Sequence, residues 1–377
     1  MLRKGGDCRC AGTHVVMRGH SRQRRSLPSP TNCHSHRRES KSSTTLTFHS
    51  NPDMTLLRSF LGFTNFRNPL LRTATPSVFF AFAIQAAFAI PSVVAQTEKL
   101  YDFSGALTYV SVTVLSLCLP WLRVPLPFTG ESIQNEGIAP GCLVPLRIAG
   151  RQAILNWRQL VLSGAVTVWA TRLGSYLFLR ILKEGRDSRF ERIRHSWVNF
   201  SIAWMAQATW ISVCLAPVVA INSVPVSALA GVPPVQLSDV IGLSLFVGGF
   251  VVEVIADWQK YTWSEEKKRK VHDEEFLTRG LWSKSRHPNY FGESVFWTGI
   301  ATVAAGALSS APVRSATGLQ SLGALILPYA SPAFTVFLLL KVSGVPLIER
   351  KYDKRYGERK DYQDWKKNTP MFIPKLL

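Results

Sequence analysis

Long runs without charged residues alternate with basic segments along most of this chain. Several runs approach the ~20 residues that an α-helix needs to cross the hydrocarbon core of a bilayer. The pattern predicts an all-α, multi-pass transmembrane bundle of about seven spans. The expected spans are 73–97, 103–122, 159–182, 197–221, 239–257, 288–310 and 316–340.

The segments between these runs indicate how the chain is divided. The first two transmembrane helices are expected within 73–122, and a loop rich in proline and glycine follows at 123–158. The remaining spans form a transmembrane core over 159–345, and a basic tail occupies 346–377. The six cysteines show no framework of pairs, so no disulfide scaffold is expected.

The first 53 residues differ in composition from the rest of the chain. They contain ten Lys and Arg residues and five of the eight histidines, without helical or strand periodicity. This composition predicts a disordered basic head. Two interpretations stay open: a targeting segment, because mitochondrial presequences are rich in Arg and Ser, or an extension that precedes a true start at Met54. The Cys and His residues of the head lack the spacing of zinc ligands, so no metal is expected.

The distribution of charge predicts the orientation of the bundle. The formal net charge is +20. With seven spans, the loops 183–195 and 258–288 and the tail from residue 341 share one side and hold 23 Lys and Arg residues, against 5 in the internal loops of the other side. The positive-inside rule places the basic side in the cytosol. No DNA- or RNA-binding module is recognisable, so anionic lipid and phosphate-bearing ligands are expected as partners and nucleic acid is not.

The stretch 280–293, GLWSKSRHPNYFGE, joins a charged loop to an apolar run. Proline is favoured at the first helical position, so a helix is expected to begin at Pro288. Cations beside a helix N-terminus suit a phosphate, and a carboxyl group one turn deeper can donate a proton to a substrate. A membrane-entry cap with a snorkelling arginine explains the same pattern. The residues spaced to share one face of this helix are Arg286, Asn289, Tyr290 and Glu293.

This stretch resembles the signature of the steroid 5-alpha-reductase superfamily, in its branch of membrane proteins of unknown function. That branch reads close to D-x-Q-K, then G-L-W, then S-R-H-P-N-Y-F-G-E. The resemblance extends in order from about residue 169 to the C-terminus. The corresponding pieces of this chain are 256–260 (ADWQK), 280–293, 342–352 (VSGVPLIERKY) and 369–374 (TPMFIP).

The resemblance implies a C-terminal reductase domain that holds NADPH within the helical bundle. It implies that Glu293 and Tyr290 polarise or protonate the substrate. For Arg172 and Arg180 two interpretations are open, namely pairing within the bundle or contact with a cofactor phosphate. Glu253 stands where better-studied members carry an Asn, so it is not carried over as a cofactor ligand. The expected cofactor-binding residues are Asn289, Arg286, His287, Asp257, Tyr352, Arg172 and Arg180.

The leading hypothesis for function is reduction of an activated C=C bond in a lipid-like substrate, such as a sterol, a polyprenoid or a fatty enone. No G-x-G-x-x-G follows a strand pattern, so a Rossmann domain is not expected. The main alternative is a methyltransferase that uses S-adenosylmethionine, because isoprenylcysteine and phospholipid methyltransferases share a similar R-H-P-x-Y-x-G turn and a later glutamate, here Glu349. A non-catalytic lipid-binding membrane protein is the second alternative. The endoplasmic reticulum is the expected location, with a mitochondrial membrane as the alternative.

Overall fold

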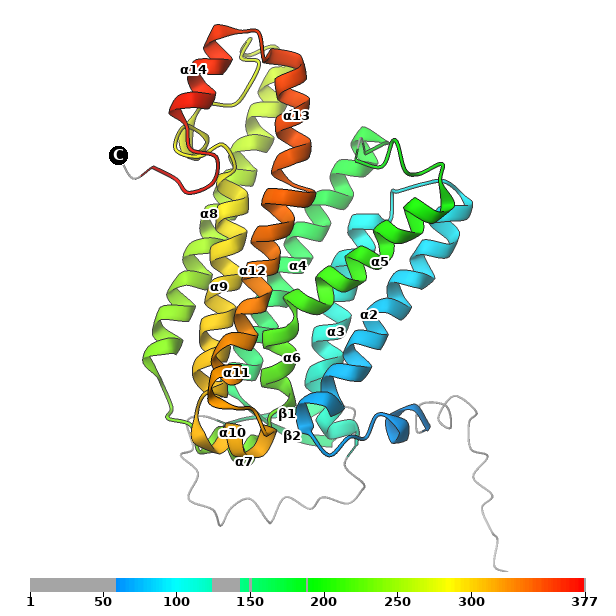
Figure 1. Cartoon of the computed structure of the whole chain (residues 1–377), viewed down its shortest axis with the longest axis vertical. Coiled ribbons are helices and arrows are strands. Elements are labelled where there is room, and N and C mark those ends of the chain that lie inside the picture. Colours follow the sequence, from blue (N-terminus) through cyan, green and yellow to red (C-terminus); the bar gives the residue numbers. More distant parts are fainter. Residues whose placement is uncertain (1–58, 124–142, 149–150, 188, 376–377) are drawn as a thin grey trace, which may run out of the picture. The chain divides into compact units, whose positions relative to one another are not determined.

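The computed structural model shows a bundle of long helices that run between two ends (Figure 1). The basic head expected over 1–53 and the residues 124–142 of the expected loop lie outside the described part of the chain. The structure describes residues 59–123, 143–148, 151–187 and 189–375.

Five helical stretches of the described chain are long and apolar enough to cross a membrane. A sixth span results if α5 (Trp197–Cys214) and α6 (Ala216–Ser223), which meet at an angle of 51°, count as one. The structure therefore supports a multi-pass helical membrane bundle with five to six such spans among the described residues, fewer than the expected seven. The five stretches are α2 (Pro69–Val94), α3 (Tyr101–Leu122), α8 (Leu237–Lys268), α9 (Pro288–Leu308) and the broken helix Ser321–Tyr356.

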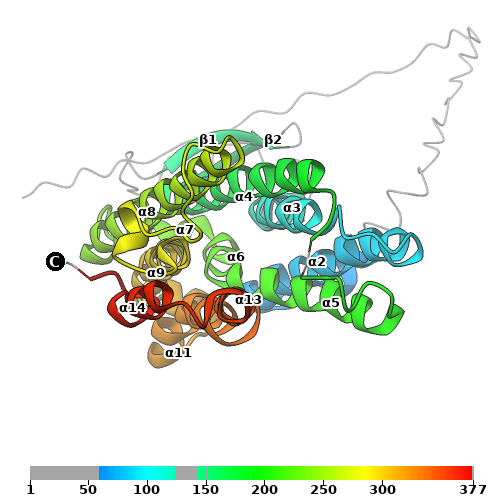
Figure 2. The same ribbon diagram turned by 90° about the horizontal axis from the view of Figure 1, so that it is seen from above.

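The expected span 159–182 accounts for the difference. It lies in α4 (Trp157–Glu184), which packs along α3 in the bundle but is less apolar than the other long helices (Figure 2). Two arginines of α4, Arg158 and Arg172, face acidic partners on α8. Arg158 is fully buried, and its guanidinium lies 2.6 Å from the carboxylate of Asp239. A helix that carries such inward-facing arginines is tolerated in a membrane bundle because each charge is paired.

The expected span 197–221 is broken between α5 and α6. Pro217 occupies the first turn of α6, and its missing N–H cannot continue the hydrogen-bond ladder of α5. The bend directs α6 into the middle of the bundle, where it contacts α2, α3, α4 and α9 (Figure 2). Every residue of α6 from Pro217 onward is buried, so this short helix belongs to the core.

The helical bundle also carries one short β-hairpin. β1 (Leu143–Ile148) pairs antiparallel with β2 (Arg151–Asn156), with Leu143 opposite Asn156 and Ile148 opposite Arg151. This hairpin lies within 123–158, the segment that the sequence predicts as a loop. The sequence signal is weak because each strand has only six residues, and Pro145 together with the arginines interrupts any alternation of apolar and polar positions.

The remaining elements are α7 (Val226–Ala230), a 3₁₀ helix (Gly280–Ser283), α10 (Ala311–Thr317), α11 (Ser321–Ile326), a second 3₁₀ helix (Leu327–Tyr329), α12 (Ala330–Phe337), a π-helix (Leu338–Val342), α13 (Val345–Tyr356) and α14 (Lys360–Asn368). The loop residues 185–187, 189–196 and 269–287 and the C-terminal helices gather at one end of the bundle, as expected for the basic side (Figure 1). We call this the α13–α14 end. The hairpin, α7 and α10 lie at the other end (Figure 1).

Glycines bring α8 and α9 into backbone contact. Gly242 and Gly249 of α8 face Gly299 and Gly292 of α9. A Cβ atom at Gly249 would lie 2.6 Å from the carbonyl oxygen of Gly292, and one at Gly292 would lie 2.6 Å from the backbone nitrogen of Glu253. Small residues at such positions let membrane helices approach closely. The contact therefore sets the separation of the acidic side chains that the two helices carry.

Candidate functional site

The two motif pieces ADWQK and GLW dock against each other. Gly280 has φ +59°, a conformation that favours glycine, and the side chain of Gln259 lies against it. The Leu281 N–H donates to the Gln259 side-chain oxygen over 2.9 Å. The Trp282 indole N–H donates to the backbone oxygen of Ala256 over 3.0 Å. These bonds anchor the loop that precedes α9 to the end of α8.

The C-terminal piece 369–374 is bound to the same loop. The Arg286 backbone N–H donates to the carbonyl oxygen of Pro370 over 2.9 Å. The Ser285 hydroxyl donates to the carbonyl oxygen of Phe372 over 2.8 Å. The tail therefore holds the residues that lead into α9, which begins at Pro288 as the sequence predicted.

The glycine of the VSGVP piece packs on the start of α9. A Cβ atom at Gly344 would lie 2.9 Å from the ring of Tyr290 and 2.7 Å from the carbonyl oxygen of Leu339. On its other side the Tyr290 ring stacks on His287, with centroids 5.4 Å apart and planes 4° apart. The four motif pieces thus converge at the α13–α14 end, although more than 100 residues separate the first from the last.

Glu349 of α13 contacts three basic residues at this end of the bundle. One guanidinium nitrogen of Arg286 lies 2.5 and 2.6 Å from its two oxygens. The His287 Nε2 and the Lys366 ammonium each lie 3.3 Å away. We call these four residues the Glu349 cluster. Burial lowers the pKa of His287 more than the neighbouring carboxylate raises it, so the ring is neutral near pH 7.

A second ionic group lies deeper, between α4, α8 and α9. Arg172 bridges Glu253, at 2.6 Å, and Asp257, with one guanidinium nitrogen on each carboxylate. The Trp169 indole N–H donates to Glu253 over 3.0 Å, and the Asn289 amide donates to Asp257 over 3.2 Å. Arg172 is therefore paired within the bundle, which is one of the two interpretations that the sequence left open.

Glu293 completes this deeper group. It lies one helical turn beyond Asn289 on α9 and is only 8% exposed. The charges of Glu253, Asp257 and Arg172 all act on its carboxyl group. We call Arg172 and the three acids the inner carboxyl cluster. It places three acidic groups around one guanidinium, which is an arrangement suited to holding and moving a proton.

A cavity opens at the α13–α14 end, beside the Glu349 cluster. The space between its lining side chains is about 570 Å³ with the open mouth included, and about 40 Å³ is available to the centres of water molecules. Aromatic rings form much of the wall. The lining residues are Lys260, Trp263, Phe276, Leu277, Trp282, Arg286, His287, Asn289, Ile348, Glu349, Tyr352, Tyr362 and Trp365.

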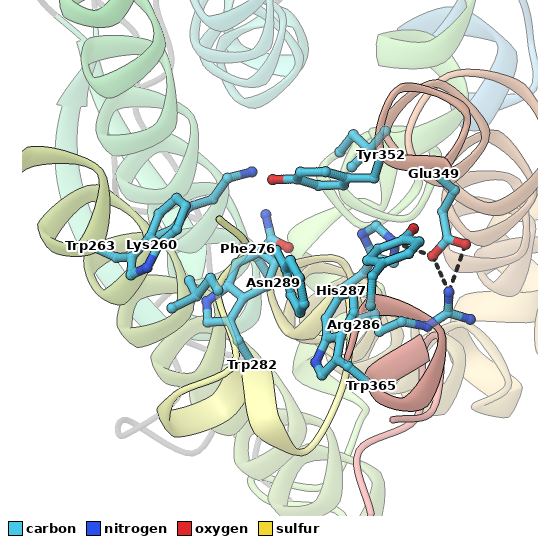
Figure 3. Close-up of a pocket in the computed structure, with 13 residues that line it drawn as sticks. Lys260, Trp263, Phe276, Trp282, Arg286, His287, Asn289, Glu349, Tyr352 and Trp365 are labelled. Atoms are coloured by element: carbon cyan, nitrogen blue, oxygen red, sulfur yellow. Dashed lines mark hydrogen bonds and ion pairs between the residues drawn. The ribbon is translucent and has the colours of Figure 1, made fainter. Parts of the chain in front are cut away.

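Polar groups that make no ion pair or hydrogen bond with the described residues face this cavity. The Lys260 ammonium and the Tyr352 hydroxyl point toward one another across it, with Asn289 nearby (Figure 3). Lys260 lies over the Trp282 ring at 5.3 Å, and in the described part of the chain it makes no ion pair. The side-chain oxygen of Asn289 is buried and has no hydrogen-bond partner among the described residues. A bound ligand can use both groups.

The predicted site residues fall into three sets. Arg286, His287, Asn289 and Tyr352 line the cavity; Arg172, Asp257 and Glu293 form the inner carboxyl cluster with Glu253; and Tyr290 packs between His287 and Gly344. The structure does not bring Arg180 into either group, because its ion pairs are with Glu184 at 4.0 Å and Asp187 at 3.6 Å. Its contact with a cofactor stays a prediction.

Sequence reasoning did not select several residues of the site. Lys260 stands in the D-x-Q-K piece, three residues after Asp257, and this spacing was the available signal. Glu253 lies one turn before Asp257 and was set aside. Trp263 lies near the end of α8. Phe276, Tyr362, Trp365 and Lys366 come from the loop and the tail, where no periodic pattern marks them.

Fold and site together define a multi-pass helical membrane protein with a cavity of aromatic and charged lining at one end and buried acids behind it. Residues 137–369 match the family described as Protein of unknown function (DUF1295). The match covers more than half of the chain, and the chain belongs to this family. No curated protein and no solved structure matches it.

Proposed function

We propose that this protein is an NADPH-dependent membrane reductase that saturates an activated C=C bond of a lipid-like substrate. One observation carries the proposal. A cavity with cationic, amide and aromatic groups lies at the basic end of the bundle, and Glu293 lies one helical turn behind Asn289 in its wall. The resemblance to the steroid 5-alpha-reductase superfamily supports the same reaction. The proposed location is the endoplasmic reticulum, with this end in the cytosol.

The chemistry of the lining fits a dinucleotide phosphate. Lys260 and Arg286 bring positive charge to the cavity, and the aromatic rings offer faces on which a nicotinamide or an adenine stacks. The space is narrow, because 40 Å³ corresponds to about three water molecules. Binding of a dinucleotide would therefore require the lining side chains of the 269–287 loop and of α14 to move apart.

Different residues of the site donate the proton, stabilise the charge and orient the cofactor. When bound, a nicotinamide would supply the hydride for the β-carbon of the C=C bond. The electron pair of that bond moves toward the carbonyl oxygen, and Glu293 gives the proton that completes the saturated product. Arg172 stabilises the carboxylate that is left behind, and a proton taken up from the cavity restores the acid. Asn289 and Tyr352 orient the cofactor at the cavity wall.

The test is cofactor binding by detergent-purified protein. NADPH is titrated against wild type, Asn289→Ala and the matched variant Asn199→Ala, whose side chain is exposed on α5. Loss of one hydrogen bond to the cofactor should weaken binding by roughly three- to tenfold in the first variant only. Absence of saturable NADPH binding, or equal affinity in both variants, overturns the reductase proposal.

Methyl transfer from S-adenosylmethionine is a second candidate, and one observation favours it. Glu349, the later glutamate of the methyltransferase pattern, lies against Arg286 and His287. Glu349→Gln discriminates between the two because it removes a negative charge beside the cavity. Affinity for anionic NADPH should rise, whereas affinity for S-adenosylmethionine, which carries a sulfonium and an ammonium group, should fall. Binding of neither cofactor favours a non-catalytic lipid-binding role.

A further inference from the structure

An apolar pocket lies between α2, α3, α5 and α6. It has a volume of about 200 Å³, and its lining is almost entirely apolar. On α2 this lining extends from Leu70 to Val78, which corresponds to roughly 12 Å along the helix. Leu71 and Val78 of the lining are 51% and 41% exposed, on the outer side of α2 that a bilayer would cover. A pocket of this composition suits a hydrocarbon chain.

Three arginines lie where this pocket approaches the end of the bundle. α2 begins and α3 ends at the end that carries the β1–β2 hairpin (Figure 1). Arg67 stands two residues before the start of α2, and Arg72 directly follows Leu71 of the pocket wall. Arg123 follows the last residue of α3, and its guanidinium donates to the carbonyl oxygen of Arg72 over 3.1 Å. The pocket wall therefore leads from an apolar interior to a group of cations.

Within the described residues, no acid balances these arginines. Arg67 and Arg72 make neither an ion pair nor a side-chain hydrogen bond there. The side-chain partners of Arg123 are neutral and include the carbonyl oxygen and the hydroxyl of Thr64, at 3.0 and 2.8 Å. Burial and then the charge of Arg72 lower the pKa of Arg123, so the two like charges act on each other. An anion placed between them would relieve this repulsion.

Topology does not explain why the arginines lie here. The internal loops expected at this end hold 5 Lys and Arg residues, against 23 at the other end, so the positive-inside rule disfavours cations here. The segment that leads into α2 also exposes two aromatic rings, because Phe63 is 85% and Phe66 40% exposed. Exposed apolar rings beside cations are typical of a surface that contacts lipid headgroups and the upper part of the acyl chains.

We propose that this place binds one anionic phospholipid, with an acyl chain in the apolar pocket and the phosphate on Arg67, Arg72 and Arg123. The pocket and the arginines follow the order of a phospholipid, with the chain toward the bilayer interior and the headgroup at its surface. A choline headgroup would add a positive charge to the arginines, so an anionic headgroup fits better. The site is distinct from the cavity at the α13–α14 end and does not depend on the proposed reductase activity.

The test is lipid binding by delipidated protein in detergent, counted by native mass spectrometry. The probes are palmitoyl-oleoyl phosphatidylglycerol and the corresponding phosphatidylcholine. A double variant, Arg67→Gln with Arg72→Gln, removes two cations that have no partner among the described residues, and Ala74→Phe places a ring in the pocket. The matched control is Arg192→Gln, which removes an exposed arginine without an ion pair in the described structure, at the α13–α14 end. Thermal unfolding without added lipid checks that each variant folds.

Wild type and Arg192→Gln should bind phosphatidylglycerol more tightly than phosphatidylcholine. The double variant should bind phosphatidylglycerol roughly thirtyfold more weakly, because two charges near the headgroup are lost. Ala74→Phe should weaken the binding of both lipids. Equal affinity for phosphatidylglycerol in wild type and the double variant, or equal affinity of wild type for the two lipids, overturns the site.

The role of the acyl chain is tested by competition. Glycerol 3-phosphate carries the phosphate without a chain and should not displace phosphatidylglycerol from wild type at equal concentration. Displacement, or unchanged lipid affinity in Ala74→Phe, would show that the arginines bind a phosphate without the pocket and would overturn the phospholipid as the ligand.

Discussion

The close contact between α8 and α9 predicts that a glycine-to-alanine change destabilises the protein at one position of α8 and stabilises it at the neighbouring position. A Cβ atom at Gly249 would lie 2.4 Å from the backbone nitrogen of Phe296 and 2.6 Å from the carbonyl oxygen of Gly292, where ordinary contact begins at 3.4 Å. The helices must therefore separate by roughly 1.0 Å, and overpacking of this kind costs about 1–3 kcal/mol. The better helix propensity of Ala returns about 0.5–1 kcal/mol. Gly249→Ala should thus destabilise the protein by roughly 0.5–2 kcal/mol.

The neighbouring residue is a matched control. A Cβ atom at Gly248 would meet nothing within 4 Å, so Gly248→Ala should gain the propensity term alone and stabilise the protein by about 0.5–1 kcal/mol. Thermal unfolding of both variants in one detergent gives the comparison. Equal stability of the two variants, or a less stable Gly248→Ala, would show that α8 and α9 do not make this contact.

Two further predictions concern the ionic groups. Arg172→Met leaves Glu253 and Asp257 without their counter-charge in the bundle and should lower the free energy of unfolding by about 3–5 kcal/mol. Arg180→Met removes only the partly exposed ion pairs with Glu184 and Asp187 and should lower it by under about 1 kcal/mol. Thermal unfolding of the two variants gives the comparison. Burial lowers the pKa of His287, so its contribution to stability is full above the unfolded value of about 6.5 and is lost as pH falls below it toward the folded pKa. Unfolding temperatures between about pH 5 and 8 should show this decline, and His287→Gln should reduce it.

The sequence predicted the parts of the fold that depend on local pattern. Apolar runs predicted the long helices, and the proline of the RHPNY piece marked the start of α9. The break between α5 and α6 was missed because both halves are equally apolar, so only Pro217 distinguishes a bend from a continuous span. The span number was overestimated because α4 is long but carries arginines whose partners lie on another helix.

The candidate site shows the same division between local and distant information. The face shared by Asn289 and Glu293 follows from spacing on one helix, and the structure retains it. The pairing of Arg172 with Glu253 could not be predicted from spacing, because the two residues are 81 positions apart in the chain. The cavity wall also depends on the tail, whose backbone oxygens accept hydrogen bonds from the loop before α9. These bonds could not be predicted from the sequence, because they involve backbone atoms of the tail and leave no side-chain pattern there.

Two separate contacts hold the inner and the outer part of the site. Each part can therefore be changed by mutation without the other. Along one face of α9, Arg286 precedes the helix at the mouth, Asn289 lies in the cavity wall, Glu293 is one turn deeper and Trp297 one turn deeper again. The glycine contact with α8 fixes the inner part of this series, whereas the tail and α13 fix its outer part. Changes in the tail should therefore alter entry to the cavity without moving the buried acids, because the two parts share only the first turn of α9.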